Sequence, residues 1–203
     1  MRPSSFSLMA SSLIFHVLLV FHGGVNVGDG LDIIDETCRK AANSDPKLSY
    51  NFCVASLHQD PGSRTANLQE LGVISMDLCE ENATYMHSYM EKLLDPEEDQ
   101  TRVDPRARKY LKDCLYLYEN AIPDVEDAIK AFEGKDYFTA NIKMSAVMDA
   151  STTCEDGFKE EKDLVSPLAK EDSDFFQLTA TALAVGVYAL KQFKLTTLIN
   201  YIY

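Results

Sequence analysis

Residues 114–154 read CLYLYENAIPDVEDAIKAFEGKDYFTANIKMSAVMDASTTC, and apolar side chains repeat at steps of three and four on both sides of Gly134. This spacing predicts two amphipathic helices joined by the turn EGKD. The apolar face before the turn holds Leu111, Cys114, Tyr118, Ala121, Val125, Ala128 and Phe132; the face after it holds Tyr137, Ala140, Met144, Val147, Ser151, Cys154 and Phe158. Because the first face continues through Pro123, we expect a kinked or restarted helix there.

Cys114 and Cys154 hold corresponding positions on these two helices. Each lies about 20 residues from Gly134, and helical residues rise by about 1.5 Å each, so both cysteines reach the same height above the turn. Their side chains can therefore meet across an antiparallel helix pair, and a disulfide between them would clamp the two helices. Two separate buried thiols are the alternative.

Two more long helices flank this pair. One is predicted over about residues 66–94, with Gly72, Met76, Cys79, Ala83, Met86, Met90 and Leu93 along its apolar face. The other is predicted over about residues 173–193, with Asp172 or Ser173 as its N-cap. It contains LTATALAVGVYAL, and an all-round apolar helix is expected to be the most enclosed one in a bundle. The fold class predicted is all-α, an up-down-up-down four-helix bundle.

The last predicted helix also contains polar side chains along its length. These are Gln177, Thr179, Thr181, Lys191 and Lys194. They argue against a membrane span, because a bilayer-crossing helix needs about 20 predominantly apolar residues.

A helical hairpin is predicted before the bundle. Short helices over about residues 32–43 and 50–59 are joined by SDPKLS, with Cys38 and Cys53 nearly symmetric about this loop. The two cysteines are not a Cys-x-x-Cys redox pair and lack further metal ligands nearby. We therefore predict a second disulfide, whose loop closure would contribute about 3 kcal/mol.

The first residues have the pattern of a secretory signal peptide. A single early arginine precedes the apolar run LIFHVLLVF, residues 13–21, which is too short to span a bilayer, and glycines follow. A membrane anchor is the alternative. We predict a signal peptide over about residues 1–28, one domain over 31–193 comprising the hairpin (31–60) and the bundle (66–193), and a C-terminal tail over 194–203.

Export would favour pairing of the five cysteines and leave Cys79 unpaired. Cys79 lies on an apolar helix face, which predicts a buried, inert thiol; a reactive or intermolecular cysteine is the alternative. The sequence Asn82-Ala83-Thr84 is an acceptor for N-glycosylation, which predicts a glycan on Asn82 in the same compartment.

Charge and missing motifs exclude several classes of function. The formal net charge of −13 would repel phosphate backbones and anionic lipid, so neither nucleic acid nor a membrane is an expected partner. The sequence lacks a nucleophile elbow, a phosphate loop and a zinc helix, and His58 and His87 have no second histidine at ligand spacing. The acidic runs DPEED and CEDGFKEE lack calcium-loop spacing. We expect no catalytic residues, metal or cofactor.

Three stretches carry a resemblance to a known family: TCRKAANSDPKLSYNFCVASL, YLKDCLYLYENAIPDVEDAI and SAVMDASTTCEDGF. Together they resemble the plant invertase and pectin methylesterase inhibitor family over about residues 32–190. The resemblance implies a four-helix bundle with an N-terminal hairpin and pairing of Cys38 with Cys53 and of Cys114 with Cys154. It also implies a secreted, non-enzymatic protein that binds an acid invertase or a pectin methylesterase one to one, in the apoplast or in the vacuole.

The same resemblance points to the turn between the second and third bundle helices. Invertase-directed members can carry Pro-Lys-Phe there, and Asp136, Tyr137 and Phe138 stand at the corresponding positions, so only the phenylalanine matches. These three residues are the candidate target-binding site; the alternative is that Tyr137 only begins the core of its helix. We expect an inhibitor of acid invertase (β-fructofuranosidase) that occludes the active cleft. The alternatives are a pectin methylesterase inhibitor and a non-inhibitory protein of the pollen-allergen type.

Overall fold

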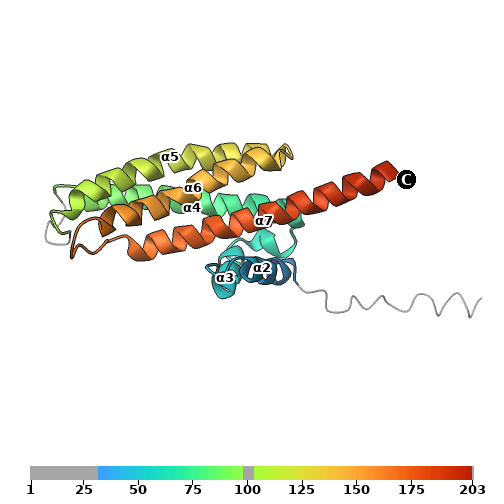
Figure 1. The fold of residues 1–203 in the computed structure, drawn as a ribbon, viewed down its shortest axis with the longest axis horizontal. Coiled ribbons are helices and arrows are strands. Elements are labelled where there is room, and N and C mark those ends of the chain that lie inside the picture. Colours follow the sequence, from blue (N-terminus) through green and yellow to red (C-terminus); the bar gives the residue numbers. More distant parts are fainter. Residues whose placement is uncertain (1–31, 98–102, 203) are drawn as a thin grey trace, which may run out of the picture. The chain divides into compact units, whose positions relative to one another are not determined.

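The computed structural model describes residues 32–97 and 103–202, and within these ranges every regular element is a helix. The elements are α2 (Ile33–Ser44), α3 (Tyr50–Leu57), the 3-10 helix η1 (Pro61–Arg64), α4 (Leu68–Leu94), α5 (Ala107–Glu133), α6 (Tyr137–Lys159) and α7 (Ala169–Ile202) (Figure 1). The all-α prediction is confirmed. The signal peptide predicted for residues 1–28 lies outside the described residues.

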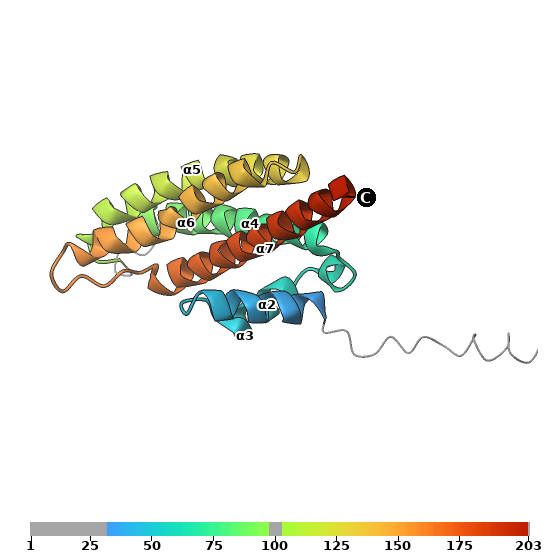
Figure 2. The same cartoon turned by 45° about the vertical axis from the view of Figure 1, so that its right-hand side comes forward.

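The four long helices α4 to α7 form the predicted bundle. Each packs on two others, α4 on α5 and α7, and α6 on α5 and α7, as both views show (Figures 1 and 2). Their apolar faces supply the core, because helices with one apolar stripe can exclude water from it only by facing one another. Leu111, Tyr118 and Phe132 of α5 and Met144 and Phe158 of α6 are at most 1% exposed.

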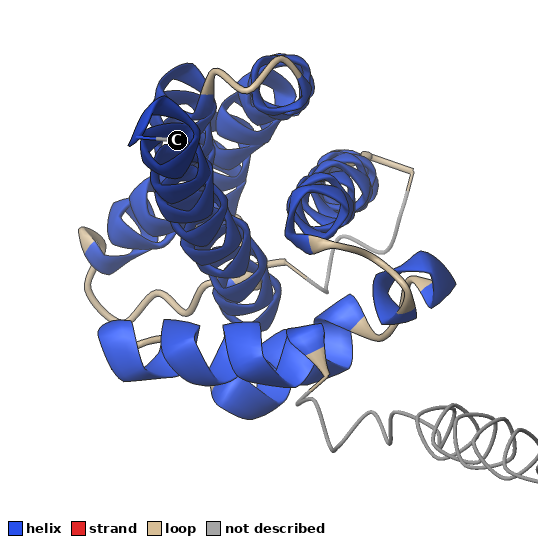
Figure 3. Cartoon of the chain, turned by 90° about the vertical axis from the view of Figure 1, so that its right-hand side faces the viewer, coloured by secondary structure: helices blue, strands red, loops and turns tan. Residues whose placement is uncertain are grey.

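The hairpin α2–α3 packs beside α7, and Figure 3 shows it crossing one side of the bundle. Each of its helices begins with a side-chain cap: Asp32 accepts from the backbone N–H of Ile34, and Ser49 accepts from that of Phe52. Ile34 and Leu57 of the hairpin are fully buried in a second apolar cluster, which includes Val185 of α7. The hairpin is therefore held to the bundle by hydrophobic burial.

Two disulfides join helices that neighbour each other, as the predicted fold requires. One links Cys38 of α2 to Cys53 of α3, with their Cα atoms 5.6 Å apart. The other links Cys114 of α5 to Cys154 of α6, with their Cα atoms 4.9 Å apart. Both disulfides lower the conformational entropy of the unfolded chain and so favour the folded state.

The last helix differs most from its predicted limits. We expected it over about residues 173–193, capped by Asp172 or Ser173, whereas α7 runs from Ala169 to Ile202. The cap prediction is wrong because Asp172 is already helical, its N–H donating to the carbonyl of Leu168, and its side chain is buried. Beyond the expected end, the chain from Lys194 to Tyr201 stays helical with every residue exposed.

Two other expectations concern helix continuity and composition. Pro123 lies inside α5, which runs as a single helix from Ala107 to Glu133, so the chain does not restart there. By length and composition alone, Ala169–Tyr201 would also be long and apolar enough to cross a membrane. Phe175 and Ala182 of α7 are fully buried in the bundle core, but only 17% of its most apolar stretch is buried, so α7 is not the fully enclosed helix that its composition predicted.

Gly72 is required by the close approach of α4 and α5. A Cβ atom placed on Gly72 would lie 2.3 Å from Cζ of Phe132, a separation that van der Waals repulsion forbids. Gly157 of α6 has a different environment, since a Cβ atom there would lie 3.5 Å from the ring of Tyr110, at ordinary contact distance.

These two glycines give a matched test of the packing. Gly72→Ala should lower the free energy of unfolding by about 1–3 kcal/mol, because the Phe132 ring must move. Gly157→Ala should leave stability unchanged or raise it by up to about 1 kcal/mol, since alanine favours the helix. Urea denaturation followed by circular dichroism measures both changes; equal effects in the two variants would contradict the close α4–α5 contact.

Candidate functional site

The candidate site is the turn between α5 and α6, where three residues, Gly134 to Asp136, reverse the chain. The N–H of Lys135 donates to the carbonyl of Phe132 (2.9 Å), and that of Asp136 donates to the carbonyl of Ala131 (2.8 Å). These two bonds form a Schellman motif, which satisfies carbonyls that the end of α5 would otherwise leave free. The turn is therefore short and fixed by its own backbone.

Lys135, not Gly134, adopts the left-handed conformation that this motif needs. Its φ is 63°, whereas Gly134 has an ordinary φ of −71°. A side chain in this region is unfavourable for most residues, and here the left-handed residue follows the glycine by one position. The consequence is that an exposed lysine stands at the tip of the turn.

Asp136 caps the helix that follows. Its carboxylate accepts a bond from the backbone N–H of Thr139 (3.1 Å) and another from the Thr139 hydroxyl (2.7 Å). Both bonds favour the charged form and hold the pKa of Asp136 below its usual value. Although the residue is exposed, its side chain is occupied in starting α6.

Tyr137 belongs to the core at this end of the bundle. It is 6% exposed, and its ring meets that of Phe132 edge-on, with the ring centres 5.0 Å apart. Its hydroxyl donates to the side-chain oxygen of Gln69 on α4, while the side-chain nitrogen of Gln69 donates to the carbonyl of Phe132 (2.9 Å). The tyrosine therefore joins the start of α6 to α4 and to the end of α5.

Phe138 points away from the bundle. It is 74% exposed, and Ile142, one helical turn further along α6, is 53% exposed. Of the three residues singled out by sequence, Phe138 is thus the one that offers an unused apolar surface. The structure adds two residues that sequence reasoning missed, Lys135 and Phe193, which lie together with the lysine ammonium 5.9 Å from the centre of the Phe193 ring.

The remaining predicted residues lie away from this turn. Cys79 is fully buried in α4, its thiol donates to the carbonyl of Ser75 (3.2 Å), and burial strongly raises its pKa. A thiol of this kind carries little thiolate and is unreactive. The Asn82 side-chain oxygen is buried without a hydrogen-bond partner, and glycosylation of this residue stays a prediction.

A pair of acidic side chains lies inside the other end of the bundle. Asp172 of α7 is 1% exposed and accepts a hydrogen bond from the hydroxyl of Tyr118 (2.5 Å) through Oδ1. Its Oδ2 accepts from no donor, and a carboxylate oxygen of Glu155 lies within 4.8 Å of its carboxyl group. Burial, followed by the neighbouring Glu155, raises the pKa of Asp172 to about 8.

This geometry fits a protonated Asp172 better than a metal ligand. Cys154 also lies within 4.8 Å, but its sulfur is already bonded to Cys114 and is not a thiolate. An Oδ2 that carries a proton needs no donor and can face the Glu155 carboxylate. A protonated Asp172 can therefore stay buried beside Glu155 without a cation.

The fold is a helical bundle with an appended hairpin and two disulfides. Its exposed turn is the type of surface by which a helical protein can bind a partner. Residues 32–185 match the model of the family described as "Plant invertase/pectin methylesterase inhibitor", and the chain belongs to this family.

Individual proteins that are similar to this chain carry names of the same family. A Platanus acerifolia protein named "Putative invertase inhibitor" is 45% identical over 89% of this chain and 95% of its own length. "Pectinesterase inhibitor 12" of Arabidopsis thaliana is 37% identical over 75% of this chain and 84% of its own. The crystal structure of a mutant pectin methylesterase inhibitor from Arabidopsis superposes with a TM-score of 0.59 at 26% identity, covering 72% of this chain and 95% of that one.

The buried acid pair predicts a particular pH dependence of stability. Asp172 keeps its proton up to about pH 8 in the folded chain but loses it near pH 3.8 when unfolded. The folded state therefore binds more protons between these values, so stability should fall as pH rises from about 4 to about 8, by at most about 1.4 kcal/mol per pH unit.

Asp172→Asn isolates this contribution, since asparagine can still accept from Tyr118 but does not titrate. Urea denaturation at several pH values should give a flatter profile for the variant than for the wild type over this range. Parallel profiles would show that Asp172 is ionised in the folded protein.

Proposed function

We propose that this chain is a secreted protein that inhibits a plant acid invertase (β-fructofuranosidase) by binding one to one over its active cleft. The observation that carries the proposal is the rigid turn that presents an exposed phenylalanine and lysine at the end of the bundle. The similarity to the Platanus protein named as an invertase inhibitor extends over nearly the whole chain and supports the same target. The chain itself would catalyse no reaction and need no cofactor.

Some residues of the turn are held by the fold, and others are exposed to a partner. Asp136 and Tyr137 are occupied with the α6 cap and the bundle core, whereas Phe138 is exposed and Lys135 is exposed beside the Phe193 ring, so both can reach a partner. A glycosidase cleft contains paired carboxylates, and a lysine at its mouth would find opposite charge there. An exposed phenylalanine supplies the aromatic anchor typical of residues that dominate binding energy.

Rigidity makes such a contact effective. The Schellman motif fixes the turn, and the Cys114–Cys154 disulfide clamps the two helices that carry it. Because little motion is lost on binding, more of the contact free energy appears as affinity. The inhibitor would thus act by covering the cleft, without rearranging itself.

A pectin methylesterase is the second candidate target. The 37% identical Arabidopsis relative is named a pectinesterase inhibitor, and the superposed crystal structure is of a pectin methylesterase inhibitor. The same bundle could cover that enzyme with its helix faces instead of its turn.

We further propose export to the apoplast, with the vacuole as the alternative. The two disulfides suit the oxidising route through the secretory pathway, where Asn82 would also meet the glycosylation machinery.

The target is identified by titration. The oxidised protein, added to acid invertase and to pectin methylesterase at about pH 5, where Asp172 is protonated, should abolish invertase activity at one equivalent. Loss of esterase activity alone would transfer the function to the second target. No effect on either enzyme would indicate a non-inhibitory protein.

Phe138 gives the test of the contact site. Phe138→Ala should weaken inhibition of invertase by about tenfold or more, since an exposed aromatic anchor is lost. The matched control is Tyr116→Ala, which removes an aromatic ring that is 66% exposed on the side of α5. Inhibition constants and melting temperatures measure both effects; equal inhibition constants for Phe138→Ala and the wild type would remove the turn from the binding site.

Lys135 can be tested without disturbing the fold. Lys135→Gly places the residue that best tolerates a φ of 63° at the tip, so the variant should be at least as stable as the wild type. If the ammonium group meets carboxylates in the cleft, its loss should weaken inhibition and reduce its salt dependence. An inhibition constant that stays unchanged at every salt concentration would exclude this contact.

A further inference from the structure

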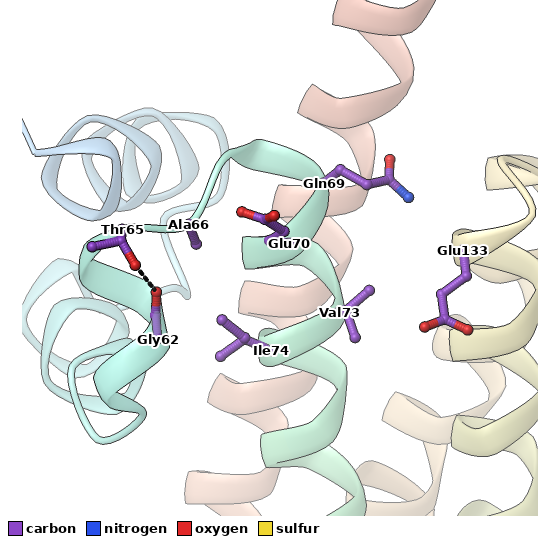
Figure 4. A pocket seen from close by; sticks show the side chains of 8 residues that line it. All are labelled: Gly62, Thr65, Ala66, Gln69, Glu70, Val73, Ile74 and Glu133. Carbon is purple, nitrogen blue, oxygen red and sulfur yellow. Dashed lines mark hydrogen bonds between the residues drawn. The ribbon is translucent and has the colours of Figure 1, made fainter.

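A groove with a volume of about 660 Å³ adjoins the candidate turn on the side of α4. Figure 4 shows its lining: Gly62 and Thr65 come from the η1 segment, Ile74 of α4 points toward that segment, and Val73 of α4 points toward Glu133 of α5. Glu133 is the last residue of α5 before the turn. Gln69, which lines the groove, also bonds Tyr137 and the Phe132 carbonyl, so groove and turn share one wall.

The lining of this groove combines apolar walls with negative charge. Ala66, Val73 and Ile74 contribute aliphatic surface, while Glu70 and Glu133 contribute carboxylates. One oxygen of Glu70 accepts the N–H of Asn67 in the capping box of α4 (2.8 Å), which leaves the other oxygen for a further donor. In the described parts of the chain, neither glutamate takes part in an ion pair.

The surroundings add to the negative potential. Asp77 lies one turn of α4 beyond Val73, and burial together with the charges of Glu81, Asp60 and Glu133 raises its pKa. Carboxylates that repel one another in this way create a field that a cation would relieve. An anionic or purely apolar ligand would not relieve it.

We propose that this groove binds a lysine or arginine side chain of the enzyme that the inhibitor covers. The proposal rests on the proposed inhibitory function and adds a second anchor beside the turn. The aliphatic stem of such a side chain matches the Ala66, Val73 and Ile74 walls, and its cationic head would be attracted by the carboxylates of Glu70 and Glu133, which border the groove on different sides. Charge complementarity at this site would set the orientation of the complex.

Neutralising the two glutamates tests the groove. The double variant Glu70→Gln/Glu133→Gln keeps both side-chain shapes, and glutamine at position 70 can still complete the capping box. It should bind the inhibited enzyme about tenfold more weakly at low ionic strength, and the difference should shrink as salt screens the charges. Glu133→Lys, which brings a cation into the groove, should weaken binding further than Glu133→Gln.

The matched control is Glu160→Gln, an exposed glutamate at the far end of α6 that changes net charge without touching the groove. Dissociation constants at two salt concentrations and melting temperatures are measured for every variant. The proposal is overturned if the double variant binds as tightly as the wild type. It is also overturned if Glu160→Gln weakens binding as much as Glu133→Gln does. If the wild type inhibits neither enzyme, the proposed function itself fails. If the wild type inhibits and the groove variants bind equally well, only the groove proposal fails.

Discussion

The packing of the Phe132 ring against the bare backbone of Gly72 is the contact on which this end of the molecule depends. It brings α5 so close to α4 that no side chain fits between them. The ring also meets Tyr137 edge-on, and the Phe132 carbonyl accepts from both Gln69 and Lys135. One buried residue therefore fixes the end of α5, the start of α6 and the backbone of the turn between them.

The candidate binding surface follows from this arrangement. Because Tyr137 is held inside, the next residue, Phe138, must point outward, and the left-handed Lys135 projects at the tip. The Cys114–Cys154 disulfide clamps the same two helices some distance below. A turn supported in this way can present an aromatic ring and a cation without losing much freedom when a partner arrives.

The opposite end of the bundle contains a buried acid, Asp172, beside Glu155. Asp172, buried beside Glu155 and bonded to Tyr118, keeps its proton at pH values where an exposed aspartate would be charged. The folded state is therefore expected to be more stable at acidic pH than near pH 8. The overall charge of −13 acts in the same direction, since its self-repulsion also weakens as pH falls.

Sequence by itself determined the helical periods, the order of the helices and, through the equal distances of Cys114 and Cys154 from Gly134, their place opposite one another. These features are local or follow from simple helix geometry. Tertiary structure alone decided that α7 starts before Asp172 and continues past Phe193, that Lys135 adopts the left-handed conformation, and that Tyr137 is buried while Phe138 is exposed. The early start of α7 and the burial of Tyr137 depend on contacts between residues far apart in the chain, Tyr118 with Asp172 and Gln69 with Tyr137, which helical spacing cannot encode.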